Sequence, residues 1–381
     1  MHEQSTAENP ESKMYAFEAG KKAIQAHYDR LNIKATVSMG QALGWYKTTY
    51  EIQGNPLISI LIPNKDHIDD LERCIESIET KSSYKNYEYI IIENNSTEKE
   101  TFEYYKKLEK ENSKVKVVYW DGIFNYSAIN NFGVKYASGE YYLLLNNDTE
   151  IINEDCLKEL LGYCQRQDVG AVGARLFYHD DTVQHGGVIV GYGGIAGHAF
   201  LGEPKENLGY FGRLVAAQDL SAVTAACMLV KSSVFEEVQG LNEELKVAFN
   251  DIDFCMKIRK AGYLIVYNPY AELYHYESKS RGMEDSPEKK KRFNSEKSTF
   301  RRNWPQILKN GDPYYNPNLS LMVKDYSIKS EQEEYEYLKN FTSLFNRYEK
   351  TKSKVFTLMI AYDCNFRCPY CYEGNISGKG R

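Results

Sequence analysis

A polar cluster that directly follows a short apolar run is the first candidate for chemistry in this sequence. Residues 143–145 are three leucines, too few for most helices, and residues 146–149 read Asn-Asn-Asp-Thr. A buried strand that ends here would present Asp148 at the carboxyl end of a sheet, where open α/β folds bind their ligands. The cluster therefore predicts a site for a metal ion or a phosphate. A plain turn is the alternative, since these residue types also favour turns.

Other acidic groups and one histidine occupy comparable positions after predicted strands or at the start of a predicted helix. They are Asp66, Glu93, Asp251 and His275. A divalent cation held by carboxylate and imidazole can neutralise a departing diphosphate, and a carboxylate that stays off the metal can accept a proton. Taken singly, each of these residues is better explained as a helix cap or a surface group than as a functional residue. Their joint position on one rim favours chemistry on a nucleoside diphosphate.

The elements that must position these groups alternate regularly in the first half of the chain. Apolar runs predict strands at 57–63, 87–92, 114–120 and 140–145, and helical spacing predicts helices after residue 66, at 98–111 and at 125–137. We expect Ser96 or Thr97 to cap the second of these helices. Strands and helices that alternate at this spacing predict an α/β fold with a mostly parallel central sheet flanked by helices.

The pattern changes after Asp148. We expect helices at 154–167, 232–238, 250–262 and 287–304, and strands at 169–173, 225–230, 264–267 and 271–275. The glycine-dense segment 184–198 has two interpretations, a phosphate cradle or flexible loops on the acceptor side. The second is favoured, because the strand-glycine-helix context of a phosphate loop is missing.

Composition shifts divide the chain into four parts. They are a small N-terminal appendage of helix and strand (1–54), the α/β domain (55–320), a charged helical linker that extends this domain (321–354) and the start of another domain (355–381).

Bulk properties exclude some classes of function. A net charge of −6 and a pI near 5.8 argue against a general nucleic-acid-binding protein. The basic cluster at 289–292, flanked by Glu288 and Glu296, predicts a solvated helix face, with contact to an anionic membrane as the alternative. No apolar leader and no run of eighteen apolar residues occur, so we expect a soluble cytoplasmic protein, with a peripheral contact to the inner face of the membrane left open.

Several motifs together resemble the inverting family 2 glycosyltransferases of the GT-A fold, over about residues 55 to 320. The matching stretches are 58–66, 90–97, Asn130-Asn131 with Gly133, Gly139-Glu140, 145–148, and 250–253 with Gly262-Tyr263. The similarity is strongest to the branch that builds O-antigen and other surface polysaccharides, whose members include rhamnosyltransferases. It implies transfer of a sugar from a nucleoside-diphosphate sugar to a saccharide acceptor, free or lipid-linked, with Mn²⁺ or Mg²⁺ as the cofactor.

The resemblance also implies roles for single residues. Asp251 would be the general base that deprotonates the acceptor hydroxyl, and Asp148 and His275 would bind the cation. The residues expected to bind the nucleotide sugar are Pro63, Asn64, Asp66, Glu93, Asn95, Asn130, Asn147 and Arg281. For Arg281, an ordinary surface arginine is the alternative.

Two positions depart from the family pattern. Asn146 replaces the first Asp of the Asp-x-Asp motif, which removes one anionic ligand and lowers the expected affinity for metal. Asn250 replaces the Glu of the Glu-Asp motif, which leaves Asp251 as the expected base. Asp253 is close in sequence, and we interpret it as a residue of a helix cap or of the acceptor loop.

Three of the eight cysteines are clustered near the end of the chain as Cys364-x3-Cys368-x2-Cys371. This spacing can hold three irons of a four-iron cluster, and it resembles the start of a radical S-adenosylmethionine domain. A zinc site would need a fourth ligand, and none is nearby. Because the sequence stops at Arg381, the 4Fe-4S cluster and S-adenosylmethionine are expected only in a longer parent chain. A recognition module of such a peptide-modifying fusion, with little transferase activity, is the alternative function.

Overall fold

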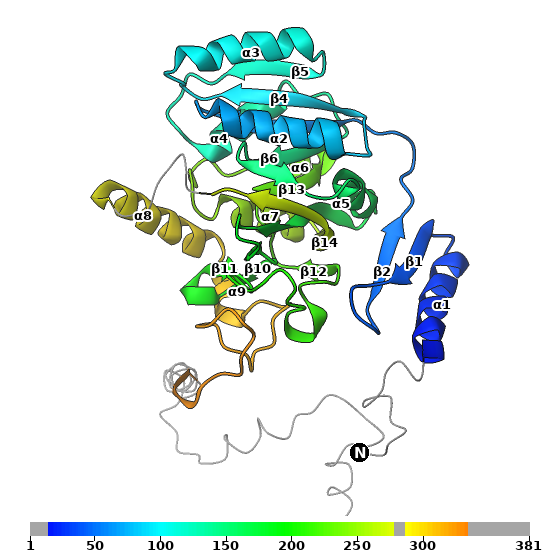
Figure 1. Cartoon of the computed structure of the whole chain (residues 1–381). Coiled ribbons are helices and arrows are strands. Elements are labelled where there is room, and N and C mark those ends of the chain that lie inside the picture. Colours follow the sequence, from blue (N-terminus) through cyan, green and yellow to red (C-terminus); the bar gives the residue numbers. More distant parts are fainter. Residues whose placement is uncertain (1–13, 278–285, 334–381) are drawn as a thin grey trace, which may run out of the picture. The chain divides into compact units, whose positions relative to one another are not determined.

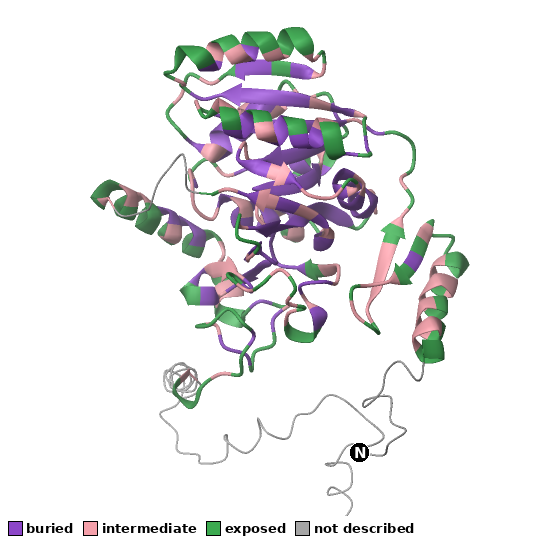
Figure 2. Cartoon of the chain, in the orientation of Figure 1, coloured by how far each residue is buried: buried purple, intermediate pink, exposed green. Residues whose placement is uncertain are grey.

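Four parallel strands form one half of the central sheet, as the apolar runs predict. The computed structural model describes residues 14–277 and 286–333 (Figure 1). In it β3 (Ile58–Asn64) pairs with β4 (Tyr87–Glu93) and with β6 (Tyr141–Leu145), and β4 also pairs with β5 (Val115–Tyr119). Ile58, Ile60 and Ile62 of β3 contribute to one buried apolar cluster and Leu61 to another. This alternation places the two clusters on opposite faces of the sheet. The strands of this sheet are largely buried (purple in Figure 2).

Three helices connect these strands. They are α2 (Ile68–Lys81), α3 (Lys99–Glu111) and α4 (Tyr126–Val134). The predicted apolar face of α2, with Leu71, Ile75 and Ile78, is buried. Helix α4 approaches the sheet closely at Gly133, where a Cβ atom would lie 2.3 Å from Ile92 Cδ1. A larger residue at this position would push α4 and its loops away from the strand ends.

The other half of the sheet contains a strand that reverses direction. β13 (Cys227–Lys231) is antiparallel to β6 and to β8 (Val169–Phe177), while β14 (Leu264–His275) is parallel to β8. With β12 (Gln218–Leu220) at the edge, the order is β12-β14-β8-β13-β6-β3-β4-β5. The predicted α/β class is confirmed, but the sheet is mixed, because β13 runs against both of its neighbours.

The segments 264–267 and 271–275, predicted as two strands, form the single strand β14. Its register against β8 is irregular between Asn268 and Glu272, which explains the break in the apolar pattern. Short elements complete this half of the domain. They are β7 (Thr149–Ile151), β9 (Val183–His185), β10 (Val188–Val190), β11 (Ala196–His198), α5 (Cys156–Cys164), α6 (Ser232–Glu237), α7 (Asn250–Lys260), α8 (Pro287–Asn303) and α9 (Pro305–Asn310).

The N-terminal segment contains one more strand than predicted. Helix α1 (Met14–Arg30) precedes an antiparallel hairpin of β1 (Ala35–Met39) and β2 (Tyr46–Tyr50). Strand β2 has the sequence Tyr-Lys-Thr-Thr-Tyr and is only partly buried. It therefore has no run of apolar residues from which a strand could be predicted. The Tyr163 hydroxyl of α5 donates a hydrogen bond to the Thr48 carbonyl at 3.2 Å, which connects the hairpin to the α/β domain.

The chain after α9 folds back on the α/β domain, and this part includes residues 321–328, the first residues of the expected linker. Leu319 and Ile328 form a bridge, and the buried ring of Tyr326 stacks on Phe200 at 4.7 Å between ring centroids. This compact unit ends at Ile328. Within the described residues, no helix has the length and apolarity needed to cross a membrane. Arg281 and the cysteines at 364, 368 and 371 lie outside the described residues.

Candidate active site

The turn after β6 is fixed by hydrogen bonds from three directions. The Thr149 hydroxyl donates to the Asn146 carbonyl at 2.9 Å, and the Asn146 amide donates to the Ala226 carbonyl at 3.0 Å, just before β13. The Tyr276 amide donates to the Asp148 carbonyl at 2.9 Å. The polar cluster predicted from the sequence is therefore a rigid turn at the carboxyl end of β6.

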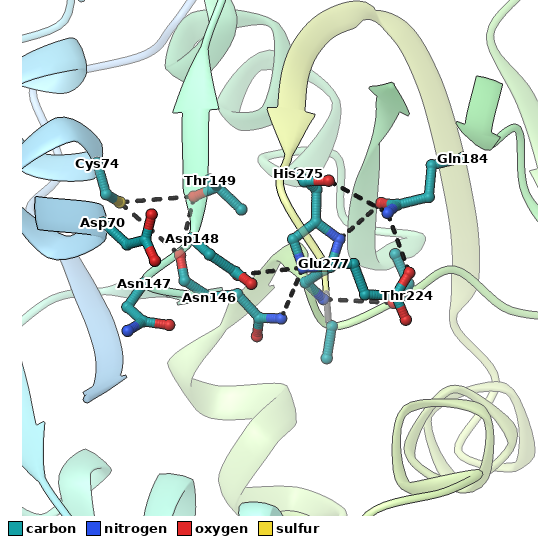
Figure 3. Close-up of polar contacts among 12 residues, drawn as sticks. Asp70, Cys74, Asn146, Asn147, Asp148, Thr149, Gln184, Thr224, His275 and Glu277 are labelled. Carbon is teal, nitrogen blue, oxygen red and sulfur yellow. Dashed lines mark hydrogen bonds and ion pairs between the residues drawn. The ribbon is translucent and has the colours of Figure 1, made fainter. Parts of the chain in front are cut away.

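Strand pairing brings His275 to this turn across more than a hundred residues of sequence. β7 and β14 are antiparallel, and His275 lies opposite Thr149. As a result, His275 Nε2 lies 3.2 Å from Asp148 Oδ1 and 3.0 Å from Asn146 Nδ2 (Figure 3). Both proposed metal ligands are buried, with Asp148 8% and His275 7% exposed.

Gln184 determines which nitrogen of His275 carries the proton. The Gln184 side-chain Nε2 donates to the His275 carbonyl at 3.3 Å and to Glu277 Oε2 at 3.1 Å, which fixes the orientation of the amide group. Gln184 Oε1, which can only accept, therefore lies 2.6 Å from His275 Nδ1. Nδ1 must carry the proton of the neutral ring. Nε2 then presents its lone pair toward Asp148 (Figure 3).

This arrangement fits a divalent cation with oxygen and nitrogen ligands. Neighbouring ligand atoms of an octahedral ion with bonds of about 2.1 Å lie roughly 3 Å apart, and Asp148 Oδ1 and His275 Nε2 are separated by 3.2 Å. A ligand imidazole also usually donates its other N–H to an oxygen, as His275 does to Gln184. In the described part of the chain, no group of three or more His, Cys, Asp and Glu side chains suits a metal. Phosphate oxygens and water would complete the shell, as is common for Mg²⁺.

Asp251 borders a cavity of about 140 Å³ that is also lined by His275, one of the two predicted metal ligands, and we call it the base cavity. Asp251 lies in the first turn of α7, and its Oδ2 accepts a hydrogen bond from the Ala225 amide at 3.3 Å. His198 and His275 also line this cavity. Burial lowers the pKa of His198, which is therefore neutral near pH 7. The predicted base and the predicted metal ligands thus share one site.

A second cavity, of about 250 Å³, lies on the other side of Asp148, and we call it the donor cavity. It is lined by Pro63, Asn64, Lys65, Asn94, Phe124, Tyr126, Asn146, Asn147, Asp148, His275 and Glu277. Tyr126, Asn146, His275 and Glu277 also line the base cavity, so the two cavities meet at these four residues.

Three of the residues predicted to bind the nucleotide sugar, Pro63, Asn64 and Asn147, line the donor cavity. The Asn147 side chain donates to Asn64 Oδ1 at 2.6 Å, and Asn64 donates to the Tyr105 hydroxyl at 2.8 Å. The amides are therefore positioned by one another.

Other predicted residues make hydrogen bonds within the protein, although the Asn130 Oδ1 atom has no partner among the described residues. Glu93 is buried and accepts hydrogen bonds from the Ser96 hydroxyl at 2.6 Å and the Tyr105 hydroxyl at 2.9 Å. Asn95 donates to the Gly122 carbonyl at 2.7 Å. Asn130 is buried in α4 and donates to the Tyr126 carbonyl at 2.8 Å. The next residue after Glu93, Asn94, lines the donor cavity in its place.

Asp66 is also committed within the protein. Its carboxylate accepts hydrogen bonds from the backbone amides of Thr97 and Glu98, at 2.9 and 3.0 Å. It therefore binds the start of α3, and its predicted contact with the nucleotide would have to compete with these bonds.

Two further acids near the base are structural. Asp253 is buried, and its Oδ1 accepts a hydrogen bond from Trp304 Nε1 at 2.7 Å, which attaches α7 to the end of α8. Glu296, predicted to flank a solvated basic face, is also buried. Its carboxylate accepts the backbone amides of residues 246–248 at 2.9, 2.9 and 3.1 Å and holds the loop that leads to Asp251.

Sequence reasoning missed Gln184, Glu277, His198 and Asn94 as members of the site. Gln184 and His198 lie in the glycine-dense segment, where no apolar periodicity indicates a direction for any side chain. Asn94 is 4% exposed, and its Oδ1 has no hydrogen-bond partner among the described residues. A buried acceptor at a cavity wall is typical of a group that binds a ligand donor.

The fold is similar to that of glycosyltransferases of the GT-A class. The solved structure of GalNAc-T7 with UDP, GalNAc and Mn²⁺ is similar to this chain, with a TM-score of 0.55, over 69% of this chain and 50% of that one. The sequence identity is 14%, so this similarity concerns the fold.

The sequence also matches a family model. Residues 59–238, somewhat under half of the chain, match the model of Glycosyl transferase family 2. The chain is 45% identical over 328 residues to an uncharacterized protein of Sinorhizobium fredii, which covers 86% of this chain and 36% of that protein. It is 35% identical over 324 residues to the O-antigen biosynthesis protein RfbC of Myxococcus xanthus, covering 85% and 25%. The chain therefore spans well under half the length of these relatives.

Proposed function

We propose that the protein transfers a sugar from a nucleoside-diphosphate sugar to a hydroxyl group of a saccharide acceptor, with inversion at the anomeric carbon. The observation that carries this proposal is the junction of the two cavities. Asp148 lines the donor cavity, Asp251 lines the base cavity, and Asn146 and His275 line both. A donor and an acceptor bound in the two cavities would meet at this junction.

Asp251 acts as the general base in this proposal. As the acceptor oxygen attacks C1 of the sugar, its proton passes to the Asp251 carboxylate. The new bond between C1 and the acceptor oxygen forms while the bond between C1 and the diphosphate oxygen breaks, and the electron pair leaves with the nucleoside diphosphate. Attack from the face opposite the diphosphate inverts the configuration at C1.

Asp148 and His275 would hold a divalent cation, Mn²⁺ or Mg²⁺, which supplies positive charge to the departing diphosphate. Asn146 replaces a possible third anion, so the protein offers one carboxylate and one imidazole at this point. Asn64, Asn94 and Asn147 would bind the nucleotide sugar from the wall of the donor cavity.

The comparisons support the class of substrate. GalNAc-T7 was solved with UDP and Mn²⁺, and RfbC is named for O-antigen biosynthesis. We therefore propose a role in the synthesis of a surface polysaccharide, on the cytoplasmic side of the membrane. The iron–sulfur site at Cys364, Cys368 and Cys371 is not part of this proposal and stays a prediction for a longer chain.

The test is the substitution Asp251→Asn, which keeps the shape of the side chain and removes the base. We expect turnover of the nucleotide sugar to fall by about 10²- to 10⁴-fold, because a positioned general base contributes about that much. Binding of nucleoside diphosphate with Mn²⁺ should stay unchanged. Asp253→Asn is the matched control, since its retained Oδ1 can still accept from Trp304. Equal turnover by wild type and Asp251→Asn would refute the assignment.

A further inference from the structure

A groove of about 330 Å³ lies beside the base cavity, and we call it the aromatic groove. It is lined by the chain from Tyr192 to Gly197, by Phe249, by Phe293 and Lys297 of α8, and by Lys324. Gly197 and Phe249 line the aromatic groove, while their sequence neighbours His198 and Asn250 line the base cavity. Adjacent residues of these two segments therefore line the aromatic groove on one side and the base cavity on the other.

Phe249 has a left-handed backbone conformation, with φ 63°, directly before α7. This conformation is rare for a bulky aromatic residue and costs about 1–3 kcal/mol, and such strain is most common at functional sites. Its ring lies 5.4 Å from that of Phe293 and 5.7 Å from that of Phe300, between ring centroids. Packing against these rings places an aromatic surface in the groove two residues before Asp251.

Gly193 and Gly197 leave space on one side of the groove, between the larger side chains of Tyr192 and Ile195. Gly193 has a φ of 57°, and a Cβ atom there would meet nothing within 4 Å. At Gly197 a Cβ atom would lie 3.3 Å from the Tyr192 side chain and 3.7 Å from Lys324 Cε. The Lys324 side chain thus extends over the glycine segment, opposite the two phenylalanine rings.

The groove is positively charged in a protein whose net charge is −6. Helix α8 contains seven basic and two acidic residues, and one of the acids, Glu296, is buried against the backbone of residues 246–248. Asp325, beside Lys324, accepts hydrogen bonds from the Ser327 amide and hydroxyl at 2.9 and 2.6 Å. Lys297 and Lys324 therefore supply the charge that faces the groove.

We propose that the aromatic groove binds a phosphate-bearing sugar unit of the acceptor. The rings of Phe249 and Phe293 would pack against the apolar face of the sugar, and Lys297 and Lys324 would bind the phosphate oxygens. This inference rests on the proposed transferase function and adds the chemical class of the acceptor. A glycosyl phosphate on a lipid carrier and one within a phosphorylated glycan share this chemistry.

The experiment measures binding to the full chain by calorimetry, with Mn²⁺ and a saturating nucleoside diphosphate present so that the donor cavity is filled. Three probes are compared, namely farnesyl-diphosphate-linked N-acetylglucosamine, N-acetylglucosamine 1-phosphate and the uncharged methyl glycoside. We expect both phosphate-bearing probes to bind at least about tenfold more tightly than the glycoside. Tighter binding of the farnesyl-linked probe identifies the lipid-linked source, and equal binding identifies the glycan source.

The double variant Lys297→Gln/Lys324→Gln should weaken binding of the phosphate-bearing probes about tenfold or more. The matched control is Lys290→Gln/Lys291→Gln, which removes two exposed charges from the same helix outside the groove lining. Phe293→Ala should weaken binding of the sugar phosphates several-fold. The ring is exposed, so its removal does not disrupt the core. Three results would overturn the proposal. The lysine double variant could bind the phosphate-bearing probes as tightly as wild type, the control variant could weaken binding equally, or the methyl glycoside could bind as tightly as the phosphate-bearing probes. Failure of the transferase function itself would instead show as a wild type that binds no nucleotide with Mn²⁺.

Discussion

At the scale of single residues, the orientation of one amide group decides what the site can bind. Gln184 is buried, and its two donated hydrogen bonds leave only Oε1 to face His275 Nδ1. The ring nitrogen next to Asp148 therefore presents a lone pair. We infer that Gln184 is a positioning residue, which prepares His275 for a metal ion without contacting the ion.

The substitution Gln184→Met tests this role, because methionine keeps the size of the side chain and loses the acceptor. We expect the dissociation constant for Mn²⁺ to rise by about 10- to 100-fold, as is typical when the group behind a histidine ligand is removed. The measurement is titration with Mn²⁺ followed by the paramagnetic resonance signal of the free ion.

The double variant Gln184→Glu/Glu277→Gln provides a rescue. A carboxylate at position 184 can still accept from His275 Nδ1, and an amide at position 277 can donate to that carboxylate. The first hydrogen bond therefore keeps its direction and the second is reversed, while the bond to the His275 carbonyl is lost. Near-normal Mn²⁺ affinity is expected. If Gln184→Met binds Mn²⁺ as tightly as wild type, Gln184 has only a structural role.

At the scale of elements, helix α3 is capped from another part of the chain. The capping expected from Ser96 or Thr97 is wrong, since the N-cap residue is Glu98 and makes no capping bond with its side chain. Asp66, after β3, accepts from the amides of Thr97 and Glu98 instead. Burial alone would raise the pKa of Asp66, but these backbone hydrogen bonds outweigh it and lower the pKa.

Asp66→Asn should therefore destabilise the protein in a pH-dependent way. Asparagine tolerates the left-handed φ of 50° at this position and keeps one acceptor oxygen, so the change removes mainly the charge at the helix start. We expect a loss of about 0.3–1 kcal/mol in the free energy of unfolding at pH 7.

The sign of the pH dependence follows from the lowered pKa. The stabilisation by the charged form is complete above the unfolded pKa of about 3.9 and is lost as the pH falls through the lower, folded value. Urea unfolding of both proteins at pH 7 and at pH 3 measures this difference. If the difference in free energy of unfolding between the two proteins stays constant, or is larger at pH 3 than at pH 7, the assignment is contradicted.

At the scale of the whole molecule, the site exists only where separate parts of the sheet end together. β6 contributes Asp148, β14 contributes His275, and α7, whose Asp251 accepts from Ala225 just before β13, contributes the base. A ligand in the two cavities would therefore bind the folded protein and not the unfolded chain.

A nucleoside diphosphate with Mn²⁺ should consequently raise the melting temperature. At a ligand concentration of about 100 times Kd the stabilisation is about 2.7 kcal/mol, which corresponds to a shift of roughly 4–5 °C for a domain of this size. Differential scanning fluorimetry with several nucleotides would also identify the base that the donor cavity prefers.

Chelation of the ion with EDTA should remove most of this shift, and Asp148→Ala should remove its dependence on Mn²⁺. A shift that survives both treatments would show that nucleotide binding needs no metal at Asp148.

The local pattern of the sequence was sufficient for the regular elements of the first half. Continuous apolar runs such as 60–62 and 89–92 bury side chains on both faces of the sheet, and the residue types alone indicate this. The resemblance to family 2 glycosyltransferases likewise led to Asp148, His275 and Asp251, which the structure brings to one pair of cavities.

Tertiary structure decided everything that depends on partners distant in sequence. The reversal of β13, the meeting of His275 with Asp148, the cap by Asp66 and the burial of Glu296 each join segments at least thirty residues apart. A carboxylate in a sequence looks the same whether it will face a ligand or a backbone amide. Only the fold determines which donors surround it, because hydrogen bonds and desolvation depend on neighbours in space and not on neighbours in the chain.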